Sequence, residues 1–362
     1  MCWPVLPGYR RGGTIQEARR TRARVDVIDV RRIIRSQHGE ALEEYPRALC
    51  CSFHTTAGYL DRGVAARLKN SSDVMPYIDV FRTMFPERAG YEHDKLERRI
   101  ELTDEQRPRE PQNADSHLAV MAGALRTCVS YPNRAGEPLA FVDLDGIHAG
   151  HARRRTTTVL GYTTEEPVAT ARIIVPVSTH SVDSINLKDP NFGVYETCAD
   201  LVAEHGVTKG RIRLALAPGE HHAGLTVNEY ETLLMRHDLQ EVLRDPLRFM
   251  AEKAGHILGN PRAIPGKTLD YAKYDLVRVF NKLVDTLGLN ESVVESVLSR
   301  AIGVPAARFL RMKRSISLLV SDRKEEGRGA IVEGTYQSPI LVQWHRGAQP
   351  TRTLDVTLTR FV

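Results

Sequence analysis

Short apolar or alternating runs, separated by polar loops, predict a chain of strands and amphipathic helices. Residues 24–30 alternate apolar and charged side chains and residues 49–53 form a short apolar run, and both patterns are typical of strands. Apolar spacing over 74–85 predicts a helix that ends at Pro86, and the spacing over 117–125 predicts another. Further strands are predicted over 140–142 and 156–160.

The same order of elements then starts again. Strands are predicted over 171–177 and 211–217, and helices over 195–205 and 232–243. Extra helix-like stretches follow at 270–287, 292–301 and 306–314, before strands predicted over 332–340 and 353–359.

Two strand-to-loop junctions share one arrangement. One reads CSFHTTAGYL and the other APGEHHAGLT, and in each a strand leads into a polar loop that ends in Ala-Gly. Their alanines, Ala57 and Ala223, are 166 residues apart. This self-similarity, together with the shared order of elements, favours a tandem duplication in which each half is one α+β unit. Coincidence of a short motif is the alternative.

Composition limits the classes of protein. Of the 362 residues, 42% are hydrophobic and 26% are charged, which excludes a disordered or coiled-coil chain. No apolar run approaches the roughly 20 residues that span a bilayer, and we find no secretory signal, so no membrane association is expected. Five cysteines without a CxxC pair argue against a disulfide framework or a zinc ribbon and indicate the reducing cytoplasm.

The formal net charge of +5 comes from the N-terminal residues. Residues 1–24 hold six arginines and one acid, Glu17, so the rest of the chain sums to zero. We interpret 1–24 as a basic tail outside the folded units. A basic tail on a neutral body is weak evidence for a polyanionic partner, so nucleic acid is not expected.

Three motifs of the first half point to a known family. They read HTTA at 54–57, YEHD at 91–94 and NADSHL at 113–118. In this combination the chain resembles the YjbQ family, also called UPF0047, which is linked to a thiamine-phosphate synthase activity. The second half keeps other parts of the family pattern, Asn228-Glu229 and GTYQ at 334–337. The first half lacks both of these.

The resemblance implies an architecture. The family is an α+β β-sandwich that assembles as a trimer, with its sites near subunit contacts. We therefore expect two tandem YjbQ-like β-sandwich units with packed helices, the first over 25–165 and the second over 168–362. A helical insertion is expected at about 245–325. The resemblance also predicts a homo-oligomer whose sites lie near contacts between units.

The losses in the two halves are complementary, which predicts a composite site. His54, His93 and His117 would come from the first half, and Glu229 with Asn228 from the second. In the alternative, the second half is a degenerate scaffold and the site lies wholly in the first half.

Two kinds of chemistry fit these residues. The three histidines can form an open site for a divalent metal such as zinc, or they can serve as acid–base groups. Asp94 is expected to orient His93, and Glu229 to act as the general base. The residues expected to bind substrate are Thr55, Thr56, Asn113, Asn228, His221, His222 and Gln337, with further charge from the arginines at 153–155. No GxGxxG or P-loop motif is present, so no organic cofactor is expected.

These observations predict a small-molecule enzyme of specialised metabolism. The favoured reaction is an elimination, such as dehydration, on a phosphorylated, sugar-like or nucleoside-like metabolite, which would make the protein a lyase. The family resemblance implies a second reaction, a transfer that joins a phosphorylated alcohol to a heterocycle. The alternative from another class is a non-catalytic ligand-binding or assembly protein.

Overall fold

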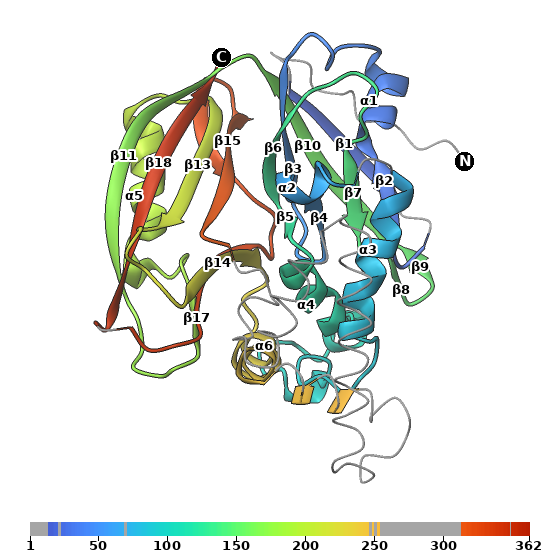
Figure 1. Ribbon diagram of the computed structural model, residues 1–362, viewed down its shortest axis with the longest axis vertical. Coiled ribbons are helices and arrows are strands. Elements are labelled where there is room, and N and C mark those ends of the chain that lie inside the picture. The colour runs from blue at the N-terminus through green and yellow to red at the C-terminus, as the bar shows by residue number, and fades with distance from the viewer. Residues whose placement is uncertain are drawn as a thin grey trace, which may run out of the picture.

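The computed structural model consists of two sets of antiparallel sheets that lie side by side (Figure 1). The structure describes residues 14–20, 23–68, 71–245, 248–249, 252–253, 313–347 and 349–362. The helices predicted over 270–287 and 292–301, and most of that over 306–314, lie outside the described residues.

The first half contains two four-stranded sheets. One has the order β1 (Thr14–Arg20), β10 (Arg154–Tyr162), β3 (Arg47–Ser52) and β6 (Cys128–Pro132). The other has the order β2 (Asp26–Asp29), β7 (Ala140–Asp143), β4 (Ala57–Leu60) and β5 (Leu125–Arg126). A short hairpin, β8 (Ile147–His148) with β9 (His151–Ala152), precedes β10.

The second half repeats this order. Its larger sheet runs β11 (Glu165–Pro176), β18 (Thr351–Phe361), β13 (Lys209–Leu216), β15 (Ser315–Glu325) and β16 (Arg328–Val332). Its smaller sheet runs β12 (Asp183–Asn186), β17 (Ser338–Gln343) and β14 (Ala223–Asn228). The register agrees as well, because Ala57 of β4 opposes Asp143 and Ala223 of β14 opposes Gln343. The two halves therefore share one sheet topology, with β5 and β16 as additions.

Side-chain periodicity explains which strands face solvent. Along β18 buried residues alternate with half-buried ones, as expected for a strand with one covered face. Every residue of β4 and β14 is buried, so these two strands are covered on both faces.

Helices join the strands and cover the sheets. They are α1 (Val30–His38), α2 (Arg62–Ala65), α3 (Ser71–Met84), α4 (Ala114–Ala122), α5 (Val194–Glu204) and α6 (Leu239–Arg244). Single turns occur at Leu96–Arg98, Arg107–Arg109, Pro190–Phe192 and, as a π-helical turn, Leu234–Asp238. α1 begins after Asp29, whose carboxylate accepts the N–H groups of Arg31 and Arg32 at 3.1 and 3.5 Å.

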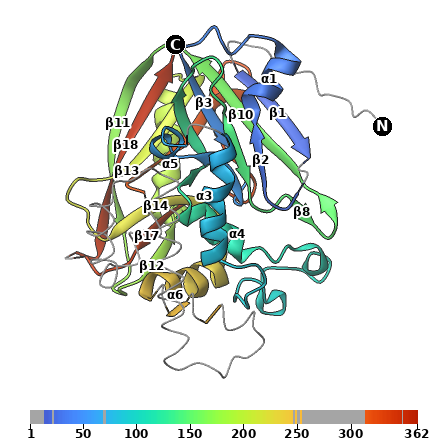
Figure 2. The ribbon, with the colours of Figure 1, turned by 45° about the vertical axis from the view of Figure 1, so that its right-hand side comes forward.

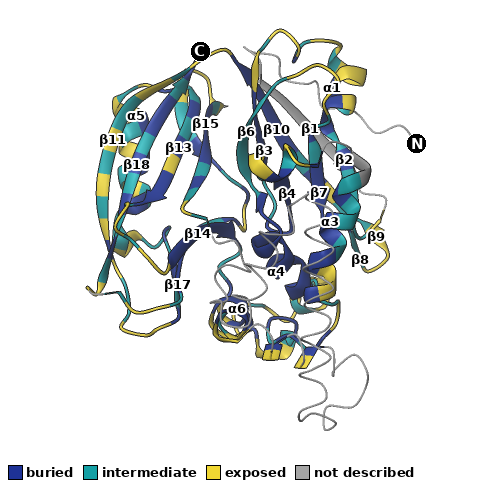
Figure 3. Ribbon diagram, viewed as in Figure 1, coloured by how far each residue is buried: buried dark blue, intermediate teal, exposed yellow. Residues whose placement is uncertain are grey.

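One hydrophobic core crosses the boundary between the halves. Leu118 of α4 and Val142 of β7 belong to the same cluster as Leu239 of α6 and Ile340 of β17. Every residue of α4 is buried, and the helix contacts β14 of the second half (Figures 2 and 3). Separating the halves would expose this core to water, so neither half keeps its full set of apolar contacts alone.

Three sequence predictions need correction. Thr14–Arg20, assigned to the tail, forms β1 because its backbone pairs along β10. The insertion predicted to about residue 325 ends earlier, since Ser315–Glu325 pairs with β13 as β15. The strand predicted over 332–340 is broken by a turn in which the N–H of Gln337 reaches the carbonyl of Gly334 at 3.1 Å. Among the described helices, none is long and apolar enough to cross a membrane.

Candidate functional site

Three of the four predicted catalytic side chains meet where the halves join. His117 projects from α4, His93 lies between α3 and α4, and Glu229 follows β14 of the second half. One nitrogen of each histidine and one oxygen of Glu229 lie within 4.8 Å of one another. The two ring centroids are 5.3 Å apart. The predicted composite of first-half histidines with Glu229 is thus present for His93 and His117.

Residues of both halves hold the His93 segment in place. Asp238 of the second half accepts the N–H groups of Glu92 and His93, each at 2.9 Å. Asp94 accepts the N–H of Ala114 at 3.0 Å, at the first residue of α4. Because a carboxylate at a helix N-terminus satisfies free N–H groups, Asp94 fixes the start of α4 while it contacts His93.

Hydrogen bonds define the tautomers of both imidazoles. His93 Nδ1 lies 3.1 Å from Asp94 Oδ1, so a neutral His93 donates from Nδ1. His117 Nδ1 lies 2.6 Å from Asn228 Oδ1, an oxygen that already accepts the N–H of Glu229 at 2.8 Å. His117 Nδ1 must therefore be the donor. Both Nε2 atoms are left with lone pairs, and that of His117 lies 3.6 Å from Glu229 Oε2.

Arg99 completes the site, although no motif in the sequence marks this residue. Its guanidinium lies 3.4 Å from His93 Nε2 and 3.5 Å from Glu229 Oε1. Glu101 and Glu110 fix it at 2.7 and 2.9 Å, and its side chain is almost wholly buried.

Burial shifts the proton affinities of this group. Burial raises the pKa of Glu229 to about 7, with Glu110 adding to the rise and Arg99 opposing it. Burial, with the charge of Arg99, lowers the pKa of His93 to about 3. Burial also lowers the pKa of His117 well below its usual value. At neutral pH both imidazoles are uncharged and Glu229 exchanges a proton.

Two imidazoles and a carboxylate are a familiar donor set for zinc. A metal held by His93, His117 and Glu229 would lie against the buried guanidinium of Arg99, which already faces two of the three ligand atoms. Glu101 and Glu110 pair with that guanidinium and offset its charge. The donor set therefore fits a divalent ion such as zinc, and metal binding stays a prediction. The cluster differs in membership from the predicted set, because His54 is not part of it.

His54 has a backbone partner instead. Its Nε2 accepts the N–H of Thr156 at 2.7 Å, and its carbonyl accepts the amide of Gln337 at 3.0 Å. Burial, followed by the charges of Arg155 and Arg153, lowers the pKa of His54 to about 3. This histidine is a neutral acceptor that fastens the β3–β4 loop to β10.

Most residues expected to bind substrate are committed to structure. Asn113 donates to Asp145 at 2.7 Å, and Thr56 accepts from Arg155 at 3.2 Å. The amide of Gln337 donates to the carbonyls of both Ser52 and His54. Asn228 orients His117 rather than substrate. Thr55 is buried in the β3–β4 loop, and no described contact indicates that it binds a ligand.

The remaining candidates lie in other places. Arg155 is buried against Asp143 with two contacts of 2.7 Å, and Arg153 pairs with Asp145. His221 and His222 are exposed on the β13–β14 loop, where the ring of His222 faces that of His345 at 5.1 Å. No described contact joins either histidine to the cluster at Glu229.

Comparisons with solved structures return YjbQ-like chains. A YbjQ-like protein of unknown function from Sulfolobus solfataricus P2 is 15% identical over 54% of this chain and 99% of its own, with a TM-score of 0.28. A hypothetical protein from Aeropyrum pernix K1 is 16% identical over 53% and 98%, with a TM-score of 0.27. An uncharacterized protein of the YjbQ/UPF0047 family from Clostridium acetobutylicum is 14% identical over 53% and 99%, also at 0.27.

Each of these likenesses covers about half of this chain and nearly the whole of the solved one. One of them belongs to the YjbQ/UPF0047 family, and another is described as YbjQ-like. Neither a protein-family model nor a curated protein matches the chain.

Proposed function

We propose that this chain is a lyase that eliminates water from a polar, hydroxylated small molecule, with Glu229 as the group that moves the proton. The observation that carries the proposal is the placement of a carboxyl whose pKa is about 7 beside a neutral imidazole, 3.6 Å from its Nε2. A group that titrates near the working pH serves well both as a base and as an acid.

One carboxyl is sufficient for the reaction. Ionised Glu229 takes a proton from carbon, and the C–H electron pair forms the C=C bond as the C–O bond breaks. Protonated Glu229 then gives that proton to the departing hydroxyl, which leaves as water, and the carboxylate is restored. The Nε2 of His117 lies 3.6 Å from Glu229 Oε2, so a neutral imidazole and not a cation faces the carboxyl on that side.

The surrounding residues position this pair. Asn228 fixes the His117 ring, and Arg99 contacts the other oxygen of Glu229. His93 and His117 are buried, whereas the side chain of Glu229 is 20% exposed. Substrate therefore meets Glu229 first.

The charge around Arg99 favours a neutral substrate over a diphosphate. Three carboxylates, those of Glu101, Glu110 and Glu229, lie within 3.5 Å of its guanidinium. They outnumber the single cation, so a multiply charged leaving group would be repelled. This weighs against the thiamine-phosphate-type transfer at this site.

A duplication explains the composite site. We infer that the halves descend from one YjbQ-like unit, and the repeated strand order with its matching register supports this. The unit-to-unit contact that the family resemblance implies would then lie within one chain, at Gln337 and the β3–β4 loop. A homo-oligomer stays a prediction, to be measured by light scattering of the full chain.

The test is an activity screen with a matched pair of variants. The full chain is incubated with hydroxy acids, sugars and nucleosides, and mass spectrometry detects loss of one water. Glu229→Gln should abolish the product, and Glu241→Gln, at an exposed position of α6, should not. Equal turnover by Glu229→Gln would overturn the proposal, as would activity that follows a stoichiometric metal and disappears with a chelator.

A further inference from the structure

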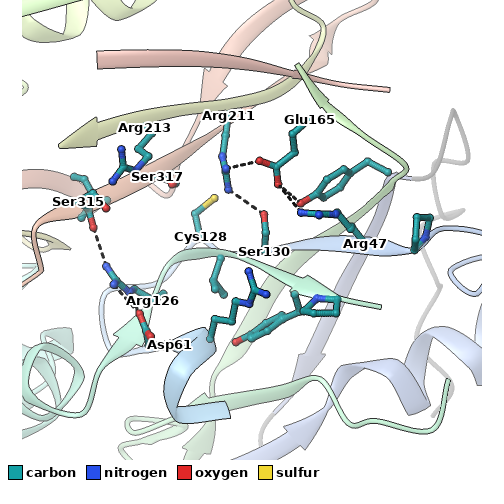
Figure 4. A pocket seen from close by; sticks show the side chains of 17 residues that line it. Arg47, Asp61, Arg126, Cys128, Ser130, Glu165, Arg211, Arg213, Ser315 and Ser317 are labelled. Carbon is teal, nitrogen blue, oxygen red and sulfur yellow. Dashed lines mark hydrogen bonds and ion pairs between the residues drawn. The ribbon is translucent and has the colours of Figure 1, made fainter. Parts of the chain in front are cut away.

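A polar cavity lies between the halves, at a different place from the cluster of residues around Glu229. It has a volume of about 690 Å³ and opens between β6 of the first half and β13 and β15 of the second (Figure 4). Its charged lining consists of the arginines Arg47, Arg62, Arg126, Arg211 and Arg213 and the acids Asp61 and Glu165. The arginines exceed the acids by three.

Two of these arginines build the walls. Arg126 contacts Asp61 at 2.6 Å and donates to the carbonyl of Ser315 at 2.8 Å, across the boundary between the halves. Arg211 contacts Glu165 at 2.6 Å and donates to the hydroxyl of Ser130 at 3.1 Å, also across the boundary. Both acids of the cavity are thereby neutralised, and Figure 4 shows these contacts on opposite sides of the space.

The remaining cationic groups lack a counter-charge. Arg62 and Arg213 are exposed residues of the lining, and among the described residues no hydrogen bond or ion pair reaches either guanidinium. Arg47 lies 3.7 Å from Glu165, which Arg211 already holds. The Nε of Arg211 is buried and has no hydrogen-bond partner. Buried N–H groups are rarely left unpaired in folded proteins, so this donor points to an absent acceptor.

We propose that this cavity binds a small organic phosphate, with Arg62 and Arg213 contributing the charge that the protein itself leaves unbalanced. Guanidinium groups present paired N–H donors that match the oxygens of phosphate. The volume falls within the 300–1,000 Å³ that is usual for metabolite sites, which leaves room for an organic group beyond the phosphate. The hydroxyls of Ser130 and Ser317 supply further donors at the wall.

The ligand would bridge the two halves, because Arg62 belongs to the first and Arg213 to the second. Binding to the folded chain alone would therefore stabilise the contact between them and raise the melting temperature. This inference does not rest on the proposed elimination, since the cavity shares no residue with the Glu229 cluster.

The experiment titrates the full chain with inorganic diphosphate and with adenosine monophosphate by calorimetry at two salt concentrations. Both should bind, and high salt should weaken both. Charge-assisted hydrogen bonds contribute about 1.5–3 kcal/mol, so Arg62→Ala/Arg213→Ala should weaken binding by at least about 10-fold. Neither arginine holds another described residue, so the double variant should fold. Arg172→Ala removes an exposed arginine of β11 that pairs with Asp355 and should bind as the wild type does.

Three results would overturn the assignment. The first is that neither diphosphate nor adenosine monophosphate binds at millimolar concentration. The second is that the double variant binds as tightly as the wild type. The third is that citrate binds as tightly as diphosphate, which would indicate a site for carboxylates. Glu229→Gln should bind diphosphate normally. Loss of binding in that variant would place the anion at the Glu229 cluster instead and equally contradict the proposal.

Discussion

The β3–β4 loop of the first half and the β13–β14 loop of the second occupy corresponding places, yet they carry different side chains. In the first half, Arg155 of β10 is buried against Asp143 of β7. In the second half, Arg352 of β18 is buried too, but the strand position that matches Asp143 holds Gln343, which lies 3.5 Å away. The carboxylate that pairs with Arg352 is Glu220, at 3.0 Å.

Glu220 stands 166 residues after His54, at the start of the corresponding loop. Glu220 supplies the carboxylate for Arg352 that β17, with Gln343 at this position, lacks. Each half contains a buried guanidinium that needs a counter-charge. The carboxylate that supplies it comes from a strand in the first half and from a loop in the second. In the Glu-His-His loop, Glu220 therefore has a structural role.

The largest expected effect tests this comparison through stability. Asp143→Ala leaves Arg155 buried without its acid, which should lower the free energy of unfolding by about 3–5 kcal/mol. Glu220→Ala should cost less, about 1–3 kcal/mol, because Arg352 keeps the carbonyls of His221 and His345 at 2.9 and 3.0 Å. Urea denaturation of the two variants gives both values. Equal losses of unfolding free energy in the two variants would contradict the expected difference between the two halves.

The next effect concerns the chemistry that both halves contribute. Glu229→Gln should lower kcat by about 100-fold or more, because the amide cannot move the proton. The folded state holds the Glu229 proton more tightly than the unfolded chain, so wild-type stability falls as pH rises from about 4.5 to 7. At pH 8 the variant should be at least as stable as the wild type. Thermal unfolding at pH 8 and pH 4 checks this, and a variant that loses activity by unfolding would contradict it.

The pH profile sharpens the assignment of the base. Because burial raises the pKa of Glu229 to about 7, kcat/KM should increase about tenfold per pH unit up to pH 7 and then level off. The pKa of His93 is lowered to about 3, so the titration of His93 should not change kcat/KM between pH 5 and 8. Initial rates across that range provide the measurement. A profile that is flat from pH 5 to pH 8 would contradict Glu229 as the base.

The smallest effect on activity is expected at His54. His54→Ala leaves the N–H of Thr156 without its acceptor, which should cost about 1–3 kcal/mol of stability. It should change kcat only a few-fold, because His54 lies outside the Glu229 cluster. Steady-state rates at a temperature where the variant is folded test this. A loss of kcat comparable with that of Glu229→Gln would show that His54 takes part in the reaction.

Several predictions from sequence agree with the structure because they depend on local pattern. The periodicity that predicted a helix over 74–85 corresponds to α3, and the strand predicted over 353–359 lies within β18. The motifs at 91–94 and 113–118 marked His93 and His117, and the Asn-Glu pair marked Glu229. Each signal is carried by neighbouring residues, where covalent geometry limits the possible structures.

The errors share a different cause. Motif membership alone could not separate His54 from His93, since the difference lies in the partner that each ring meets after folding. The ring of His54 accepts the backbone N–H of Thr156, whereas the ring of His93 contacts the carboxylate of Asp94. Arg99 was missed because its burial depends on Glu101, Glu110 and Glu229 closing around it. The strand at 315–325 was placed in an insertion because its pairing partner, β13, is about a hundred residues away in the chain.

By itself, the sequence determined the periods of the strands and helices, the repeated junction and the residues able to carry a proton. Only the tertiary structure decided that the halves share one core, that His117 faces Glu229, and that Glu220 balances Arg352. The physical reason is the distance along the chain over which each effect acts. Side-chain periodicity acts over a few residues, whereas burial and charge pairing also join residues more than a hundred positions apart. Such contacts set the pKa of Glu229 and the partner of Arg352.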